Sequence, residues 1–189
     1  MKDINLTELL TRDHKRENKI DRFNSSEVWA ILNGYITPKE YLFGKKLEMK
    51  DIKTMWRGTI KHKALESYLK ELGWETEVKT EINYKPDKEH FWTLVGKADG
   101  IKENEVLELK TSEKIINQAK PWQEFQVKLY CSLFNKEIGG IYQPIFTKDQ
   151  FLLRLIGEVK KNDKWFREVI EKLNDFYKKL LDYERNKNS

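Results

Sequence analysis

The spacing of apolar residues along this chain changes from helical to strand-like and back again. Between residues 54 and 72 they recur every three or four positions, which predicts a helix of about five turns that ends at Gly73. Apolar and polar residues then alternate from 77 to 84, the pattern of a half-buried strand. Two more apolar segments, 91–99 and 106–111, predict two further strands joined by a polar turn.

The flanking segments predict additional helices and a hairpin. Residues 24–27 resemble a capping box before a short helix at 28–32, and Pro38 opens a second short helix that Gly44 ends. Pro121 opens a helix that runs to about residue 134. Segments 141–147 and 150–156 then predict a hairpin, and a long amphipathic helix follows at about 160–183.

This order of elements predicts a single domain of the α/β class, or α+β mixed, with a central mixed β-sheet flanked by helices. The order is α-β-β-β-α-β-β-α after an N-terminal helical segment. We expect that segment to span residues 1–53, the core to span 54–156, and the C-terminal helix to occupy 157–189.

Composition excludes several classes of protein. Aromatic residues make up 12% of the 189 residues, which argues against disorder. The single cysteine excludes an intrachain disulfide framework and any site that needs several thiolates, including an iron–sulfur cluster. The chain has no apolar run of the ~20 residues that span a bilayer and no apolar leader, so we expect a cytoplasmic protein without a membrane partner.

Positive charge is concentrated in one segment. The net charge is +5, and residues 45–63 alone hold seven basic and two acidic residues, an equal local excess. Such a segment is a candidate contact surface for a polyanion. Arg57 and Lys61, on the predicted helix, are the best candidates, followed by Lys45 and Lys46.

The strand at 106–111 carries charges that are unusual in an apolar segment. Glu108 and Lys110 lie on one face of it, where a charge is unfavourable unless it is paired or bound to a metal. Glu-x-Lys occurs four more times in the chain, so an exposed ion pair is the simpler interpretation of this pair alone. Asp99, however, ends the preceding strand, and a hairpin would bring it beside Glu108. Two adjacent carboxylates favour a hard cation such as Mg²⁺ or Mn²⁺.

Two helices add residues at matching spacing. Gly58, His62 and Glu66 are four residues apart and share one helical face. Glycine disfavours a helix by roughly 1 kcal/mol relative to alanine, so Gly58 indicates either that something approaches the backbone closely or that the residue lies in a frayed first turn. Gln126 and Tyr130 are also four residues apart and could hold nucleic acid, although the pair alone is typical of ordinary packing.

Taken together, these residues resemble the PD-(D/E)XK nuclease superfamily, in particular RecB-type nuclease domains and CRISPR-associated RecB-like exonucleases. The resemblance covers roughly residues 25–130. It rests on four motifs in the family's order: Gly58-x3-His62-x3-Glu66, Gly96-Lys97-Ala98-Asp99, Glu108-Leu109-Lys110 and Gln126-x3-Tyr130.

The resemblance implies a restriction-endonuclease-like core and a set of roles. His62, Asp99, Glu108 and the Leu109 carbonyl would bind one or two Mg²⁺ or Mn²⁺ ions, and Lys110 would be the catalytic lysine. Gln126 and Tyr130 would position DNA, and Glu66 is a further candidate from the first motif. Many CRISPR-associated members hold an iron–sulfur cluster with four cysteines. With Cys131 alone, this chain is expected to lack one.

We therefore expect a metal-dependent DNA nuclease that hydrolyses phosphodiester bonds, most simply an exonuclease on linear double-stranded or single-stranded DNA. A structure- or site-specific endonuclease is the alternative within the enzyme class. Two further alternatives are a non-catalytic DNA-binding module with the same fold and an α/β domain whose motifs coincide by chance. Besides DNA, a second copy of the chain or a recombination or repair protein is an expected partner.

Overall fold

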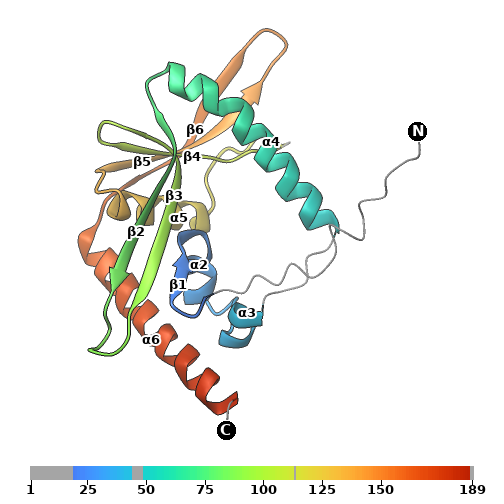
Figure 1. Cartoon of the computed structure of the whole chain (residues 1–189). Helices are drawn as coiled ribbons and strands as arrows, with labels where there is room; N and C mark the ends of the chain where they lie inside the picture. The colour runs from blue at the N-terminus through green and yellow to red at the C-terminus, as the bar shows by residue number, and fades with distance from the viewer. Residues whose placement is uncertain (1–18, 44–48, 113, 188–189) are drawn as a thin grey trace.

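The computed structural model describes residues 19–43, 49–112 and 114–187 (Figure 1). The described residues form a six-stranded mixed sheet with helices packed on both faces. In chain order the elements are β1 (Arg22–Asn24), α2 (Ser25–Leu32), α3 (Pro38–Phe43), α4 (Met49–Glu71), β2 (Glu75–Tyr84), β3 (Trp92–Lys102), β4 (Glu105–Leu109), α5 (Pro121–Leu133), β5 (Ile138–Phe146), β6 (Phe151–Lys160) and α6 (Asp163–Lys187).

Strand β3 organises the sheet. It pairs antiparallel with β2 along most of its length, in parallel with β1 near its start, and antiparallel with β4 at its end. Strands β4 and β5 are parallel, and β5 and β6 are antiparallel. Parallel neighbours require a crossover, and α5 provides it between β4 and β5. This architecture confirms the predicted mixed α/β class.

Alternate residues of β4 face different helices. Leu107 and Leu109 pack against Leu65 and Leu69 of α4. Val106 belongs instead to the larger core, which includes residues of α2, α5 and α6. In Figure 1, α4 accordingly lies apart from α2, α5 and α6. Because side chains of a strand alternate between faces, Glu108 is expected on the side of α5.

Helix α5 packs closely against the sheet because β5 carries a glycine beneath it. A Cβ atom at Gly139 would collide with the side chains of Val127 and Cys131 on α5. Both of these side chains are fully buried. The small residue therefore lets α5 approach the sheet, which places Gln126 and Tyr130 near the end of β4.

The structure corrects several details of the sequence prediction. Strand β1 was not predicted, because three residues are too few to show an alternating pattern. The predicted capping box is not formed: the Asn24 side chain donates to the Glu27 carboxylate at 3.0 Å and makes no bond to the helix backbone. Helix α4 begins at Met49, before the predicted start. Lys45 and Lys46 lie outside the described residues. In the described part of the chain, no helix has the length and apolarity to cross a membrane.

Candidate active site

The candidate site lies where β3 and β4 separate. Their ladder ends at the pair Gly100–Leu107, whereas β4 stays paired with β5 as far as Leu109–Tyr142. The Leu109 amide donates a 2.7 Å hydrogen bond to the Asp99 carboxylate (Oδ2). Asp99 does not end its strand as predicted, because β3 continues to Lys102. The fork between the strands, and not a hairpin end, therefore brings Asp99 to β4.

His62 reaches the fork from α4. Its Nδ1 lies 3.2 Å from Oδ1 of Asp99. The hydrogen bond to Asp99 raises the pKa of His62, and this effect outweighs the opposing effect of burial. Leu65 and Leu69, which pack against β4, hold α4 over this end of the sheet. The contact between His62 and Asp99 therefore depends on the position of His62 on α4 and on the separation of β3 from β4 at the fork.

Glu108 is a buried acid that pairs with the ammonium group of Lys110. Only 5% of the residue is exposed. Burial, followed by the charge of Asp99, raises the pKa of Glu108 well above its usual range, while the nearby Lys110 acts in the opposite direction. The Nζ of Lys110 donates to Oε1 of Glu108 at 2.6 Å. The predicted pairing of these two side chains is therefore a direct ion pair, although β4 ends at Leu109, before the predicted end, and Lys110 follows it with its amide bonded to the Tyr142 carbonyl at 2.8 Å.

A chain of hydrogen bonds holds Lys110 from the side of α5. Lys110 Nζ also donates to Oε1 of Gln126 at 3.1 Å, and Gln126 Nε2 donates to the Tyr130 hydroxyl at 2.8 Å. That hydroxyl is hydrogen-bonded to Ser25 of α2 as well, and burial raises the pKa of Tyr130. Nζ further lies 4.9 Å from the ring centre of Trp122. Sequence analysis missed Ser25 and Trp122, since no spacing rule connects them to Lys110.

Other predicted residues stand apart from these contacts. Oε1 of Glu66 accepts from Lys70 at 2.8 Å and from Thr76 at 3.1 Å, so this carboxylate is tied to its own helix and to β2. Arg57 is exposed on α4, and Lys61 is half-buried directly before His62. A Cβ atom at Gly58 would meet Thr111 Oγ1 at 3.7 Å, an ordinary contact. The described protein atoms therefore do not require glycine at this position.

The donors at the fork suit a divalent cation by type. Asp99, Glu108 and His62 offer two carboxylates and an imidazole, and a buried carboxylate beside a second one is stabilised by a cation. In the present arrangement Lys110 supplies that positive charge to Glu108. Among the described residues, no three His, Cys, Asp or Glu side chains gather closely enough to hold one ion.

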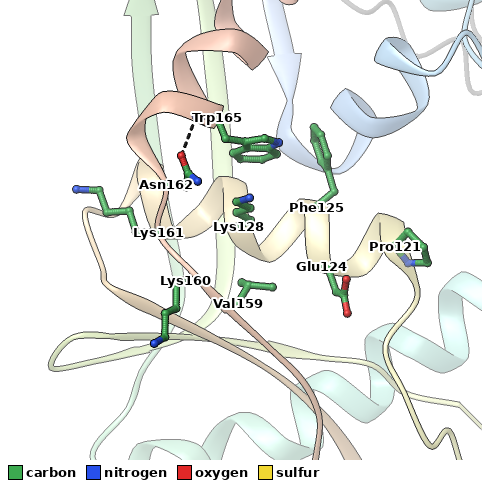
Figure 2. A pocket seen from close by; sticks show the side chains of 9 residues that line it. All are labelled: Pro121, Glu124, Phe125, Lys128, Val159, Lys160, Lys161, Asn162 and Trp165. Carbon is green, nitrogen blue, oxygen red and sulfur yellow. Dashed lines mark hydrogen bonds between the residues drawn. The ribbon is translucent and has the colours of Figure 1, made fainter.

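A separate hollow of about 470 Å³ lies between α5, the end of β6 and the start of α6 (Figure 2). It contains three lysines, but they do not converge. Lys128 lies 4.7 Å from the ring centre of Trp165, and Lys161 bonds Asn135 at 2.8 Å. Figure 2 shows Lys160 and Lys161 pointing in different directions. By helical spacing, Lys128 also lies on a different side of α5 from Gln126.

Comparison with known proteins identifies the fold. No family model and no curated protein matches the chain. Seven chains of solved structures do, and three of them illustrate the similarity. One is that of SSO0001, with a TM-score of 0.57 and 22% identity over 90% of this chain and 80% of that one.

The other two are structures of LHK-Exo, an alkaline exonuclease from Laribacter hongkongensis. The first has a TM-score of 0.58 and 16% identity over 89% of this chain and 94% of that one. The second, a complex with dAMP, has a TM-score of 0.58 and 14% identity over 94% of this chain and 98% of that one. The chain therefore shares its mixed α/β fold with these proteins, while its relation to RecB-type or CRISPR-associated proteins stays a prediction.

Proposed function

We propose that this chain is a divalent-metal-dependent deoxyribonuclease that hydrolyses phosphodiester bonds at the β3–β4 fork, and that it acts as an exonuclease on linear double-stranded or single-stranded DNA. One observation carries the proposal. His62, Asp99, Glu108 and Lys110 come from a helix and two strands, and they are in contact or within electrostatic reach of one another. These four residues belong to a fold that the chain shares with an alkaline exonuclease.

Asp99, Glu108 and His62, with the Leu109 carbonyl, would hold the ion. Mg²⁺ and Mn²⁺ both suit this donor set, and imidazole favours Mn²⁺. The bound ion would act as a Lewis acid toward the phosphate. His62 contacts Asp99 through Nδ1, which leaves its Nε2 as the second ring nitrogen for such a role.

Lys110 would stabilise negative charge that develops on the phosphate. An ammonium group has three N–H donors, and Glu108 and Gln126 accept two of them. The third can reach a phosphate oxygen, where a preorganised donor stabilises the transition state. Gln126 and Tyr130 are buried and bonded to this network, which favours positioning of Lys110 as their role over direct contact with DNA.

Arg57 and Lys61 would contact the DNA backbone. Both belong to α4, and Lys61 immediately precedes His62. Cations beside a cleavage site can fix the register of the phosphates without reading bases. Lys45 and Lys46 are proposed for the same surface from their sequence position alone.

Cleavage assays test the activity directly. End-labelled linear DNA, circular DNA and single-stranded DNA are incubated with Mg²⁺, Mn²⁺ or EDTA. An exonuclease shortens the linear and single-stranded DNA from an end, spares circles and is inactive in EDTA. Cleavage of circles would establish the endonuclease alternative.

A non-catalytic DNA-binding module is the second candidate, because Lys110 already neutralises Glu108 and no three ligands gather among the described residues. DNA binding without cleavage in any metal would favour it. Calorimetric titration adds an independent measurement: His62→Ala should weaken Mn²⁺ binding by a larger factor than Mg²⁺ binding. Unchanged Mn²⁺ affinity would remove His62 from the proposed ligands.

A further inference from the structure

A second hollow adjoins the candidate site on the side of α4. Its volume is about 490 Å³, within the range of small-molecule pockets. Lys61 and Tyr68 of α4 line it, together with Thr111, Ser112 and Phe151. Lys61 directly precedes His62 on α4, and a Cβ atom at Gly58, one helical turn before His62, would lie 3.7 Å from Thr111 Oγ1, so the hollow begins beside His62.

Two aromatic rings stand exposed at this hollow. Tyr68 is 57% exposed and Phe151 is 38% exposed. Their ring centres are 6.2 Å apart, and the ring planes are inclined at 57°. The rings therefore do not stack on each other, and both keep surface toward solvent. Large apolar side chains exposed together in a hollow commonly mark a binding surface.

Three further lining residues match the other parts of a nucleotide, and Ala64, Leu65 and Pro144 complete the wall with apolar surface. Lys61 supplies a positive charge for a phosphate, and the hydroxyls of Thr111 and Ser112 supply hydrogen-bonding groups. The residues that line the hollow include no acid. One cation, two hydroxyls and two aromatic rings form a combination suited to single-stranded nucleic acid, where bases stack on aromatic rings and cations follow the backbone.

We propose that this hollow holds an unpaired nucleobase of the DNA strand that is cut at the fork. The base lies against Tyr68 and Phe151, and Lys61 contacts a phosphate of the same strand. The inference rests on the proposed function and deepens it, because it selects a strand with an unpaired nucleotide as the form that the site accepts. A fully paired blunt end fills the hollow only after its last pairs open.

Binding measurements in Ca²⁺, which supports binding with little cleavage, test the proposal. The probes are a ten-nucleotide thymidine strand and a blunt duplex of mixed sequence. Stacking of one base is worth about 1–3 kcal/mol, so Tyr68→Ala combined with Phe151→Ala should weaken single-strand binding about 5- to 150-fold. Duplex binding should change by less than about twofold.

Matched variants separate stacking from other effects. Phe91→Ala removes a comparably exposed ring at the other end of β3 and should leave both affinities unchanged. Tyr68→Phe keeps the ring and should bind the single strand like the unmodified protein. A strand with 2-aminopurine at an internal position should lose fluorescence on binding, and the double alanine variant should abolish that loss.

Two results would overturn the inference. Unchanged single-strand affinity in the double alanine variant would exclude a base at this hollow. An equal loss for strand and duplex, or a change in sedimentation of the DNA-free protein, would assign the rings to folding or to a protein contact. Lys110→Ala should lose cleavage yet keep the single-strand preference, so failure of the proposed nuclease activity can be told apart from failure of this inference.

Discussion

Lys110, the first residue after β4, and Glu108, near the end of that strand, form an ion pair of 2.6 Å, and both side chains are largely buried, with 15% and 7% exposed. A buried pair of this kind is weak evidence for stability, because removing two charges from water offsets much of their attraction. The ion pair lies beside Asp99 and His62. This position suits catalysis, because the four residues together can bind a metal and a phosphate.

Replacing either member of this pair should remove cleavage. Lys110→Ala removes the donor proposed to face the phosphate, and Glu108→Gln keeps the shape but removes a ligand charge. We expect each to lower the cleavage rate at least about 100-fold while DNA affinity in Ca²⁺ changes little. Single-turnover kinetics on end-labelled DNA measure the rate, and Lys88→Ala, an exposed lysine between β2 and β3, is the control. Cleavage at the unmodified rate in either variant would disprove the assignment.

Asp99 should show separate effects on stability and activity. Its carboxylate accepts from the Leu109 amide, and an alanine would leave that amide without a partner in a buried position. Asp99→Ala should therefore lower the free energy of unfolding by about 1–3 kcal/mol. Asp99→Asn keeps an oxygen acceptor and should retain most of that stability, yet lose cleavage with the ligand charge.

Urea unfolding in EDTA compares the two Asp99 variants without any contribution from a metal. Equal stability losses in both would mean that the charge of Asp99, and not its hydrogen bond to Leu109, holds the fork. Normal cleavage by Asp99→Asn would exclude Asp99 as a ligand.

The Tyr130 hydroxyl should act on catalysis through Gln126 and Lys110. Tyr130→Phe removes the hydroxyl's hydrogen bonds to Gln126 and Ser25 and should lower kcat about tenfold with KM nearly unchanged, as is common for groups that orient an active-site residue. Tyr177→Phe is a matched control, because its hydroxyl bonds the Phe91 carbonyl away from the fork. A higher KM at constant kcat would instead support direct contact of Tyr130 with DNA.

The sequence predicts a contact in this site when the two residues are close together along the chain, and it does not when they are far apart. The two-residue period of a strand was sufficient to place Glu108 and Lys110 on one face, and the helical period placed Gln126 beside Tyr130. The fork at Gly100 could not be predicted, because β4 pairs with β5 along its whole length but with β3 only as far as Leu107, and β5 lies about 30 residues away in the sequence.

Ser25 illustrates the same limit. In the sequence it belongs to a helix start, and its hydroxyl has no pattern that connects it with Tyr130. The metal-ligand roles inferred from the family resemblance stay proposals, because donor identity predicts which ion suits a site but not how side chains arrange around it.

The thiol of Cys131 should react slowly and with a shifted pH dependence. Burial raises its pKa from an ordinary value near 9 to about 11. At pH 8 the folded protein should thus have about a hundredfold less thiolate, and iodoacetamide labelling should be slower by at least that factor than in guanidinium. Because the raised pKa belongs to the folded state, the associated loss of stability begins only as pH rises past about 9. Mass spectrometry of the labelled protein measures both states, and equal rates at pH 8 would contradict the buried position.

The salt dependence of DNA binding should identify the proposed backbone contacts on α4. Each phosphate contact that is lost lowers the slope of log affinity against log salt by about 0.9 for duplex DNA and about 0.7 for a single strand. Arg57→Ala with Lys61→Ala should therefore reduce the duplex slope by about 1.8, similarly for unrelated DNA sequences. Lys164→Ala with Lys172→Ala removes two charges from exposed positions on α6, which lies apart from α4 in Figure 1, and should leave the slope unchanged. Because both double variants lower the net charge equally, a smaller slope in the first alone places the backbone along α4. An unchanged slope in the first, or equal changes in both, would place the DNA on another surface.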